Sequence, residues 1–278
     1  MIIDCHTHTF PDRIADSVLR KLSRNSGIVP YLDGTNTGLL RSMEKSGVDL
    51  SVILPVATSP EQVIKVNDAS QRLNEQYAGR LLSFACIHPD FENPAEELRR
   101  VRNLGFKGIK LHPIYQGVDL TDMRMLRIIG TAAELGLVVV THTGFDIGYP
   151  GAVYCTPQMC RQVVREIGDF PFVLAHMGGW REWDVVPDLL AETSVCLDCA
   201  FSMGKIDELP GTARQPDMLD EAGMMRFIRA FGADRILYGS DSPWTDQART
   251  MAFVSHFPIT DAEKAAILGG NAARLLNF

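Results

Sequence analysis

Short apolar segments of strand length alternate with amphipathic helical segments along the sequence, and this alternation limits the possible folds more than any other feature. Most of the apolar segments lack outward polar positions, which is typical of parallel strands covered by helices. Eight such segments occur, at residues 1–8, 50–56, 81–87, 106–111, 137–142, 172–176, 195–201 and 235–238. We therefore predict an α/β fold, a (β/α)8 TIM barrel that forms a single domain over residues 1–278.

An open, doubly wound sheet is the alternative for the same alternation. Such a sheet usually binds a dinucleotide at a Gly-x-Gly-x-x-Gly turn after its first strand, and this sequence has no such turn there. Helix signals accompany the strands. Ser-Pro-Glu-Gln at 59–62 and Thr-Asp-Ala-Glu at 260–263 are predicted helix starts, and Gly269-Gly270 predicts a break in the last helix.

Charge and composition exclude several classes of partner. The formal net charge is -7 and the lysines and arginines do not cluster, which argues against a nucleic-acid or anionic membrane surface and favours a small-molecule substrate. No apolar run reaches the roughly 18 residues of a membrane span, and the sequence does not start like a signal peptide. We predict a cytoplasmic protein whose six cysteines are reduced. Homo-oligomer formation is left open.

The first strand ends in two histidines separated by one residue. Because successive side chains on a strand point to opposite faces, Asp4, His6 and His8 are expected to share one face. Two imidazoles spaced in this way can bind one cation together. The pattern therefore predicts a metal pair, with ordinary hydrogen-bonded histidines as the alternative.

Further histidines and an acid follow the other predicted strands at their carboxyl ends, where the active sites of barrels lie. Five of the seven histidines gather there. The residues at these ends are His6, His8, Lys110, His112, His142, His176 and Asp241. Imidazoles and a carboxylate around one opening are what a catalytic divalent metal requires.

Six segments, in the same order along the chain, resemble the amidohydrolase superfamily. They are DCHTHTFP (4–11), GFKGIKLHP (105–113), THTG (141–144), AHMGG (175–179), GSDSPW (239–244) and LGGNAARLL (268–276). Within the superfamily the chain looks like the amidohydrolase-related (amidohydrolase 2) group, which includes aminocarboxymuconate semialdehyde decarboxylase and related hydrolases, lactonases and hydratases. The resemblance covers nearly the whole chain and is more specific for the family than for the substrate.

The resemblance implies a ligand set and catalytic roles. It implies that His6, His8, His142 and Asp241 hold one divalent metal ion, which activates a water molecule. Asp241 accepts and relays the proton of this water, and His176 is the implied general base or proton donor. Three imidazoles and one carboxylate favour zinc, with manganese, cobalt and iron as alternatives.

Two residues of the fourth predicted strand have less certain implied roles. Superfamily members with two metals bridge them through a carbamylated lysine on the strand that carries Lys110 here. We predict one metal, because the group that the chain most resembles is mononuclear. His112, two residues further on the same face, is the predicted substrate contact.

The implied activity is hydrolysis of an amide, ester or lactone bond in a small metabolite. The alternative is non-oxidative decarboxylation, or hydration, of a small unsaturated carboxylic acid at the same site. The site of a phosphoesterase needs more histidines and acidic residues than we can place in this sequence. A protein that only binds its ligand, without catalysis, would hold a buried or blocked metal ion with no exchangeable water. Arg181 and Arg214 are the two candidates for pairing with a substrate carboxylate.

Overall fold

The computed structural model describes residues 1–204, 206–210 and 218–278. In this part of the chain nine parallel strands form two sheets, in the orders β1-β2-β3 and β4-β5-β6-β7-β8-β9. The strands are β1 (Ile3–Thr7), β2 (Leu50–Ile53), β3 (Leu81–Ser83), β4 (Ala85–Cys86), β5 (Gly108–Leu111), β6 (Val138–Thr141), β7 (Phe172–Leu174), β8 (Cys196–Asp198) and β9 (Ile236–Leu237).

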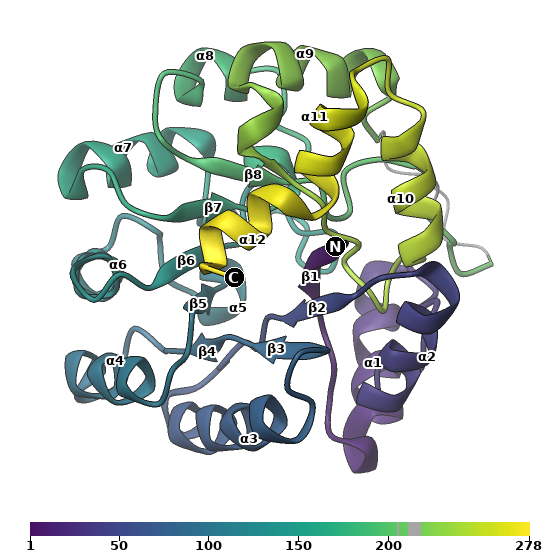
Figure 1. Cartoon of the computed structure of the whole chain (residues 1–278). Helices are drawn as coiled ribbons and strands as arrows, with labels where there is room; N and C mark the ends of the chain where they lie inside the picture. The colour runs from purple at the N-terminus through teal and green to yellow at the C-terminus, as the bar shows by residue number, and fades with distance from the viewer. Residues whose placement is uncertain (205, 211–217) are drawn as a thin grey trace.

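The two sheets join into one barrel at both seams. At the first seam only Phe84 separates β3 from β4, so the predicted third strand is present but broken, and counting its halves together gives eight strands. At the second seam, the Cys5 N–H donates to the Tyr238 carbonyl (2.9 Å) and the Asp241 N–H donates to the His6 carbonyl (2.8 Å). Figure 1 shows the closed ring of strands with helices outside it, which confirms the predicted (β/α)8 barrel.

Helices occupy most of the connections between strands. The α-helices are α1 (Asp12–Ser26), α2 (Asn36–Ser46), α3 (Val63–Gln76), α4 (Pro94–Asn103), α5 (Pro113–Gln116), α6 (Met123–Glu134), α7 (Pro157–Ile167), α8 (Val186–Leu190), α9 (Glu221–Phe231), α10 (Gln247–Ser255), α11 (Asp261–Ala265) and α12 (Asn271–Leu276). Three 3-10 turns, η1 (Pro60–Gln62), η2 (His176–Gly178) and η3 (Ala233–Arg235), and a π-helical turn, η4 (Ala266–Gly270), complete the set. Within the described ranges, none of the helices combines the length and the apolar character that a membrane span needs.

Both predicted helix starts are confirmed, but their capping contacts differ. Thr260 and Glu263 form the predicted capping box at the start of α11. At residues 59–62 the turn η1 begins at Pro60, directly after Ser59, as predicted. The Ser59 side chain makes no capping bond, and the Gln62 side chain accepts instead from the Thr58 N–H at 2.9 Å. The predicted break is η4, where a Cβ on Gly269 would lie 2.2 Å from the Met1 carbonyl oxygen. This close approach requires glycine.

The core has two layers, which leave one end of the barrel for the site. One layer lies between strands and helices, and the other fills the barrel interior. The interior layer consists of Ile3, Cys5, Leu50, Val52, Leu54, Phe84, Val138, Val140, Val173 and Leu237, together with Ala272 and Leu276 of α12. α12 therefore covers the end of the barrel where the strands begin, close to the N-terminus (Figure 1). The carboxyl ends of the strands remain free to form a pocket.

The first strand corrects one prediction. Its pairing with β2 shifts register between Asp4 and Thr7, as a β-bulge does. The strict alternation predicted from the sequence is therefore wrong here. Asp4 contacts Gln247 of the outer helix α10, whereas His6 and His8 reach the pocket.

Candidate metal centre and substrate pocket

A cavity of about 390 Å³ opens at the carboxyl ends of the strands. Polar residues form part of its lining, and aromatic side chains such as Phe145, Trp180 and Trp244 form another part. All seven residues that the sequence placed at the strand ends line it: His6, His8, Lys110, His112, His142, His176 and Asp241. The barrel therefore brings these distant residues together in one pocket.

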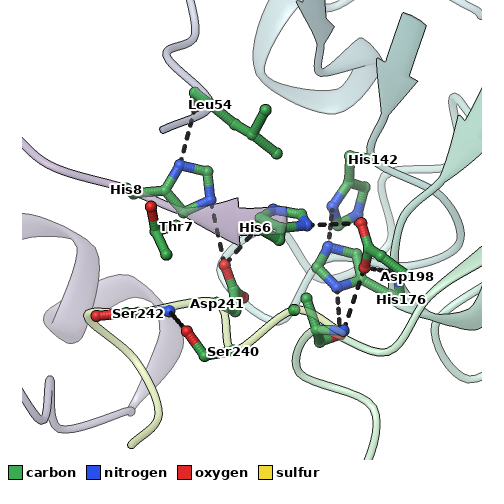
Figure 2. A network of polar contacts seen from close by, with 12 residues as sticks. His6, Thr7, His8, Leu54, His142, His176, Asp198, Ser240, Asp241 and Ser242 are labelled. Carbon is green, nitrogen blue, oxygen red and sulfur yellow. Dashed lines mark hydrogen bonds and ion pairs between the residues drawn. The ribbon is translucent and has the colours of Figure 1, made fainter. Parts of the chain in front are cut away.

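His6, His8 and Asp241 form one of two groups of possible metal ligands in the described part of the chain. The Asp241 Oδ1 lies 3.1 Å from the His8 Nε2 and 3.7 Å from the His6 Nε2 (Figure 2). The three ligand atoms lie within 4.8 Å of one another. Two imidazole nitrogens and a carboxylate oxygen at these separations can bind one divalent cation at their centre.

Hydrogen bonds at the Nδ1 atoms of His6 and His8 orient both imidazole rings. The His8 Nδ1 faces the Leu54 carbonyl oxygen at 2.9 Å, and the His6 Nδ1 faces the Asp198 Oδ2 at 2.9 Å. Because a carbonyl or carboxylate can only accept, Nδ1 carries the proton in each neutral ring and Nε2 is left with a lone pair. Both free nitrogens face Asp241 (Figure 2).

Asp198 was missed as a site residue by the sequence analysis. Its Oδ1 accepts from the backbone N–H groups of His176 and Ala200, both at 3.1 Å, while its Oδ2 holds His6. A carboxylate at the end of an otherwise apolar strand was the available signal. Asp198 links the candidate metal ligand to the candidate proton donor.

We expect Asp198→Asn to weaken metal binding by about 10- to 100-fold without unfolding the protein. An asparagine can keep both backbone bonds through its oxygen, but its amide group then faces the His6 Nδ1 and favours the tautomer with the proton on Nε2. Chelator competition measures the affinity. Asp184→Asn, at a side chain that is 99% exposed, is the matched control. Unchanged affinity in Asp198→Asn would show that Asp198 does not set the His6 tautomer.

Asp241 is held in an uncommon backbone conformation. Its φ is +62°, in the left-handed region that non-glycine residues rarely adopt. Asp4 fixes the preceding residue by accepting from the Ser240 N–H (2.9 Å) and the Ser240 hydroxyl (2.6 Å). Asp4 also accepts from the Gln247 amide at 2.8 Å. A buried network therefore supports the residue that carries the candidate metal-binding carboxylate.

The charges of the pocket suit a cation. Burial lowers the pKa of His6 well below its usual value, and Lys110 adds to this effect. Burial opposes ionisation of Asp241, but the contacts of its carboxyl with the His8 and His6 side chains outweigh burial and lower the pKa of this carboxyl. A neutral imidazole and an ionised carboxylate are the forms that bind a metal.

His142 lies beside His176, outside the group formed by His6, His8 and Asp241. The His142 Nδ1 and the His176 Nε2 are 3.0 Å apart, and the outer nitrogens face the carbonyls of Phe145 (3.2 Å) and Ala200 (2.8 Å). Because a carbonyl oxygen can only accept, the ring nitrogen that faces each carbonyl carries the proton. If both rings are neutral, the His142 Nδ1 and the His176 Nε2 therefore face each other with no proton between them. A bound cation would remove this mismatch, so the donors present fit a metal.

A second group of possible ligands contains His112, His142 and Asp146. The His112 Nε2 lies 3.7 Å from the Asp146 Oδ2, and the His112 ring stacks on His142 with ring centroids 4.2 Å apart. Burial raises the pKa of Asp146 to about 6. The sequence analysis missed Asp146, although it follows the strand-end His142 by only four residues.

Lys110 is buried on the pocket floor. Its Nζ lies 3.4 Å from the His6 Nε2, and burial lowers its pKa to about 8. Of the two arginines considered for a substrate carboxylate, Arg181 lies over the Trp180 ring, 5.7 Å from the centroid. Arg214 lies outside the described residues. Lys110 is thus a buried cation beside the candidate metal ligands.

Comparison with known sequences identifies a family. A sequence model of the family described as amidohydrolase matches residues 3–278. A search of curated proteins finds no match to the chain. The family match covers every residue considered above as a possible ligand or catalytic group.

Solved structures resemble the chain over nearly its full length. An uncharacterized TIM-barrel protein from Bordetella bronchiseptica is 18% identical with a TM-score of 0.76, covering 99% of this chain and 98% of that chain. A 2,6-dihydroxybenzoate decarboxylase from Rhizobium is 18% identical with a TM-score of 0.69 (99% and 98%). A 5-carboxyvanillate decarboxylase from Novosphingobium aromaticivorans, with bound manganese, is 15% identical with a TM-score of 0.73 (100% and 97%).

The predicted hydrolysis of an amide, ester or lactone is wrong. Several of the similar structures are decarboxylases, which are lyases, and they support the alternative prediction instead. The sequence motifs identify the family to which the matched model belongs. They do not identify which bond is broken, because one fold can host different reactions.

Proposed function

Because the chain belongs to the amidohydrolase family, we propose that it is a metal-dependent, non-oxidative decarboxylase of a small unsaturated carboxylic acid. One observation carries the proposal. The convergent His6, His8 and Asp241 lie with the buried cation Lys110 in a pocket that also has aromatic walls. Such a pocket suits a flat acid whose carboxylate is drawn to the cationic end. The similar decarboxylases have substrates of this kind.

We assign the metal to His6, His8, His142 and Asp241, with one divalent ion. When bound, the ion polarises a substrate oxygen and fixes the substrate beside His176. The three imidazoles and one carboxylate suit zinc, whereas the similar 5-carboxyvanillate decarboxylase contains manganese. Elemental analysis of the purified protein distinguishes the two metals, and a content near one ion per chain supports the assigned site.

The residues of this chain supply orientation and a proton. As the bond between the substrate carbon and its carboxylate breaks, the electron pair stays on the carbon and carbon dioxide leaves. That carbon then needs one proton, which we assign to the Nε2–H of a His176 ring protonated on both nitrogens, because the Nδ1 proton stays bound to the Ala200 carbonyl. His176 is positioned for this role by its own bonds to Asp198 and Ala200, and it regains the proton from solvent. His112 is the proposed contact for the far side of the substrate.

The test is a product-resolved screen of aromatic and unsaturated acids with the manganese-reconstituted or zinc-reconstituted protein. We expect carbon dioxide release together with a product that lacks one carboxyl group. The double variant His6→Ala/His8→Ala should release none, because it removes two proposed ligands. A hydrated or hydrolysed product without carbon dioxide would overturn the assignment of decarboxylation.

A further inference from the structure

We propose that the end of the pocket beside α1 is an apolar subsite, so that the preferred substrate is an unsaturated acid that carries an aliphatic substituent. This inference rests on the proposed function and adds to it the group that extends the substrate away from its reacting carboxylate. The cavity of about 390 Å³ reaches from Asp241 at the strand ends to Val18 and Leu22 of α1. Cavities of this size are typical of drug-sized ligands, so this one has room beyond the reacting group.

α1 has an apolar face that turns toward the cavity. The buried residues of the helix are Ala15, Leu19 and Ser23, which lie one turn apart and face the rest of the protein. Val18 and Leu22 are also one turn apart, but they are half-buried and line the cavity. A helix that only covers a barrel needs a single apolar face. The face formed by Val18 and Leu22 is therefore suited to contact a ligand.

The loop after β6 forms the opposite wall of this end. Ile147 and Tyr149, the neighbours of Gly148 in the sequence, both line the cavity. A Cβ on Gly148 would lie 3.8 Å from the Asn25 Cβ and 4.0 Å from the Ser26 Cβ, so the loop lies close to the last turn of α1. Helix and loop therefore enclose this end of the cavity and supply side chains with large apolar surfaces from both sides.

The two ends of the cavity differ in polarity. The strand ends supply the candidate metal ligands and the buried cation Lys110. The polar lining residues Lys21 and Asn25 of α1 are exposed, so they can stay hydrated while a ligand contacts Val18 and Leu22. Burial of apolar surface favours binding, whereas burial of an unpaired charge opposes it. We therefore expect the substrate carboxylate at the strand ends and the aliphatic group beside α1.

The experiment measures binding to the metal-reconstituted protein by calorimetry, independently of turnover. The probes are 3-alkylbenzoates and 4-alkylbenzoates, from methyl to butyl, and the unbranched 2-alkenoates from but-2-enoate to oct-2-enoate. In at least one series we expect the affinity to rise by about 2- to 4-fold for each added methylene group, the upper value being that for full burial. Affinities that stay level or fall in every series, or no binding of any probe, would overturn the subsite.

Leu22→Asn provides a sharper test, because asparagine is close to leucine in size and makes the wall polar. We expect the longest alkyl probe to lose about 5-fold or more in affinity, while the parent acid without the alkyl group binds as before. Ile14→Asn is the matched control, because Ile14 lies two turns earlier on α1, is 40% exposed and does not line the cavity. An unchanged profile in Leu22→Asn, or an equal loss in Ile14→Asn, would contradict the proposal.

Val18→Phe tests the same end by size, and it keeps the inference testable if Leu22→Asn does not fold. The larger side chain fills part of the space beside α1, so the longest probes should bind more weakly while the parent acid keeps its affinity. Equal weakening of the parent acid and the longest probe would show that the alkyl group does not lie beside α1.

Two results separate this inference from the proposed function. A gain in affinity with chain length, without carbon dioxide release from any acid in the screen, refutes decarboxylation and supports the subsite. Carbon dioxide release without such a gain supports decarboxylation and overturns the subsite.

Discussion

His176→Ala is expected to keep near-normal metal content and to lower turnover by about 10²- to 10⁴-fold, because His176 is the proposed proton donor and not a ligand. The structure places its Nε2 against the His142 Nδ1, while its Nδ1 is bound to the Ala200 carbonyl. Removing the imidazole takes away the proton source and leaves His6, His8 and Asp241 in place. Metal stoichiometry and turnover, measured on the same preparation, check this result.

His142→Ala is the matched comparison, and we expect it to lose metal and activity together. Each of these two variants removes one ring of the same contacting pair, so they share any general effect of opening the pocket. A metal-free but folded His176→Ala would make His176 a ligand. Full metal content in His142→Ala would restrict the ligand set to His6, His8 and Asp241.

Asp4→Ala is expected to destabilise the protein by about 3 to 5 kcal/mol, the range for leaving several buried polar groups unpaired. Asp4 is fully buried and accepts from His6, Ser240 and Gln247. These bonds close the seam between β1 and the segment after β9. Burial also raises the pKa of Asp4 to about 6, so desolvation outweighs the hydrogen bonds that favour the charged form of this carboxyl. Chemical unfolding followed by tryptophan fluorescence measures the change.

Asp4→Asn is the control for this prediction and should cost roughly 1 kcal/mol. The asparagine oxygen can accept from His6 and Ser240 as before. The Gln247 Oε1 is buried without a partner, and rotation of that amide lets it accept from the new amide nitrogen. An equal loss in both variants would show that the charge of Asp4, and not its pairing with buried donors, stabilises the seam.

The sequence by itself determined the barrel and the set of residues at its mouth. The eight apolar runs carry the strand signal locally, because burial on both faces requires continuous apolar side chains. Once parallel strands close a barrel, their carboxyl ends meet at one opening. His6, His142, His176 and Asp241 were therefore predictable as neighbours, although up to 235 residues separate them along the chain.

The tertiary structure alone decided how these residues are oriented and supported. The bulge in β1 turns His6 toward the pocket and Asp4 toward Gln247, against the simple alternation of a strand. Asp198 and Asp146 gain their roles only from partners on other elements or from loop geometry, and a single sequence does not contain that information. The type of each side chain can be read from the sequence position by position. The direction of its hydrogen bonds and the loss of water around it depend on every chain segment that packs against it. For this reason the sequence could predict the types of the candidate metal-binding residues, but it could not show which hydrogen bonds orient their side chains.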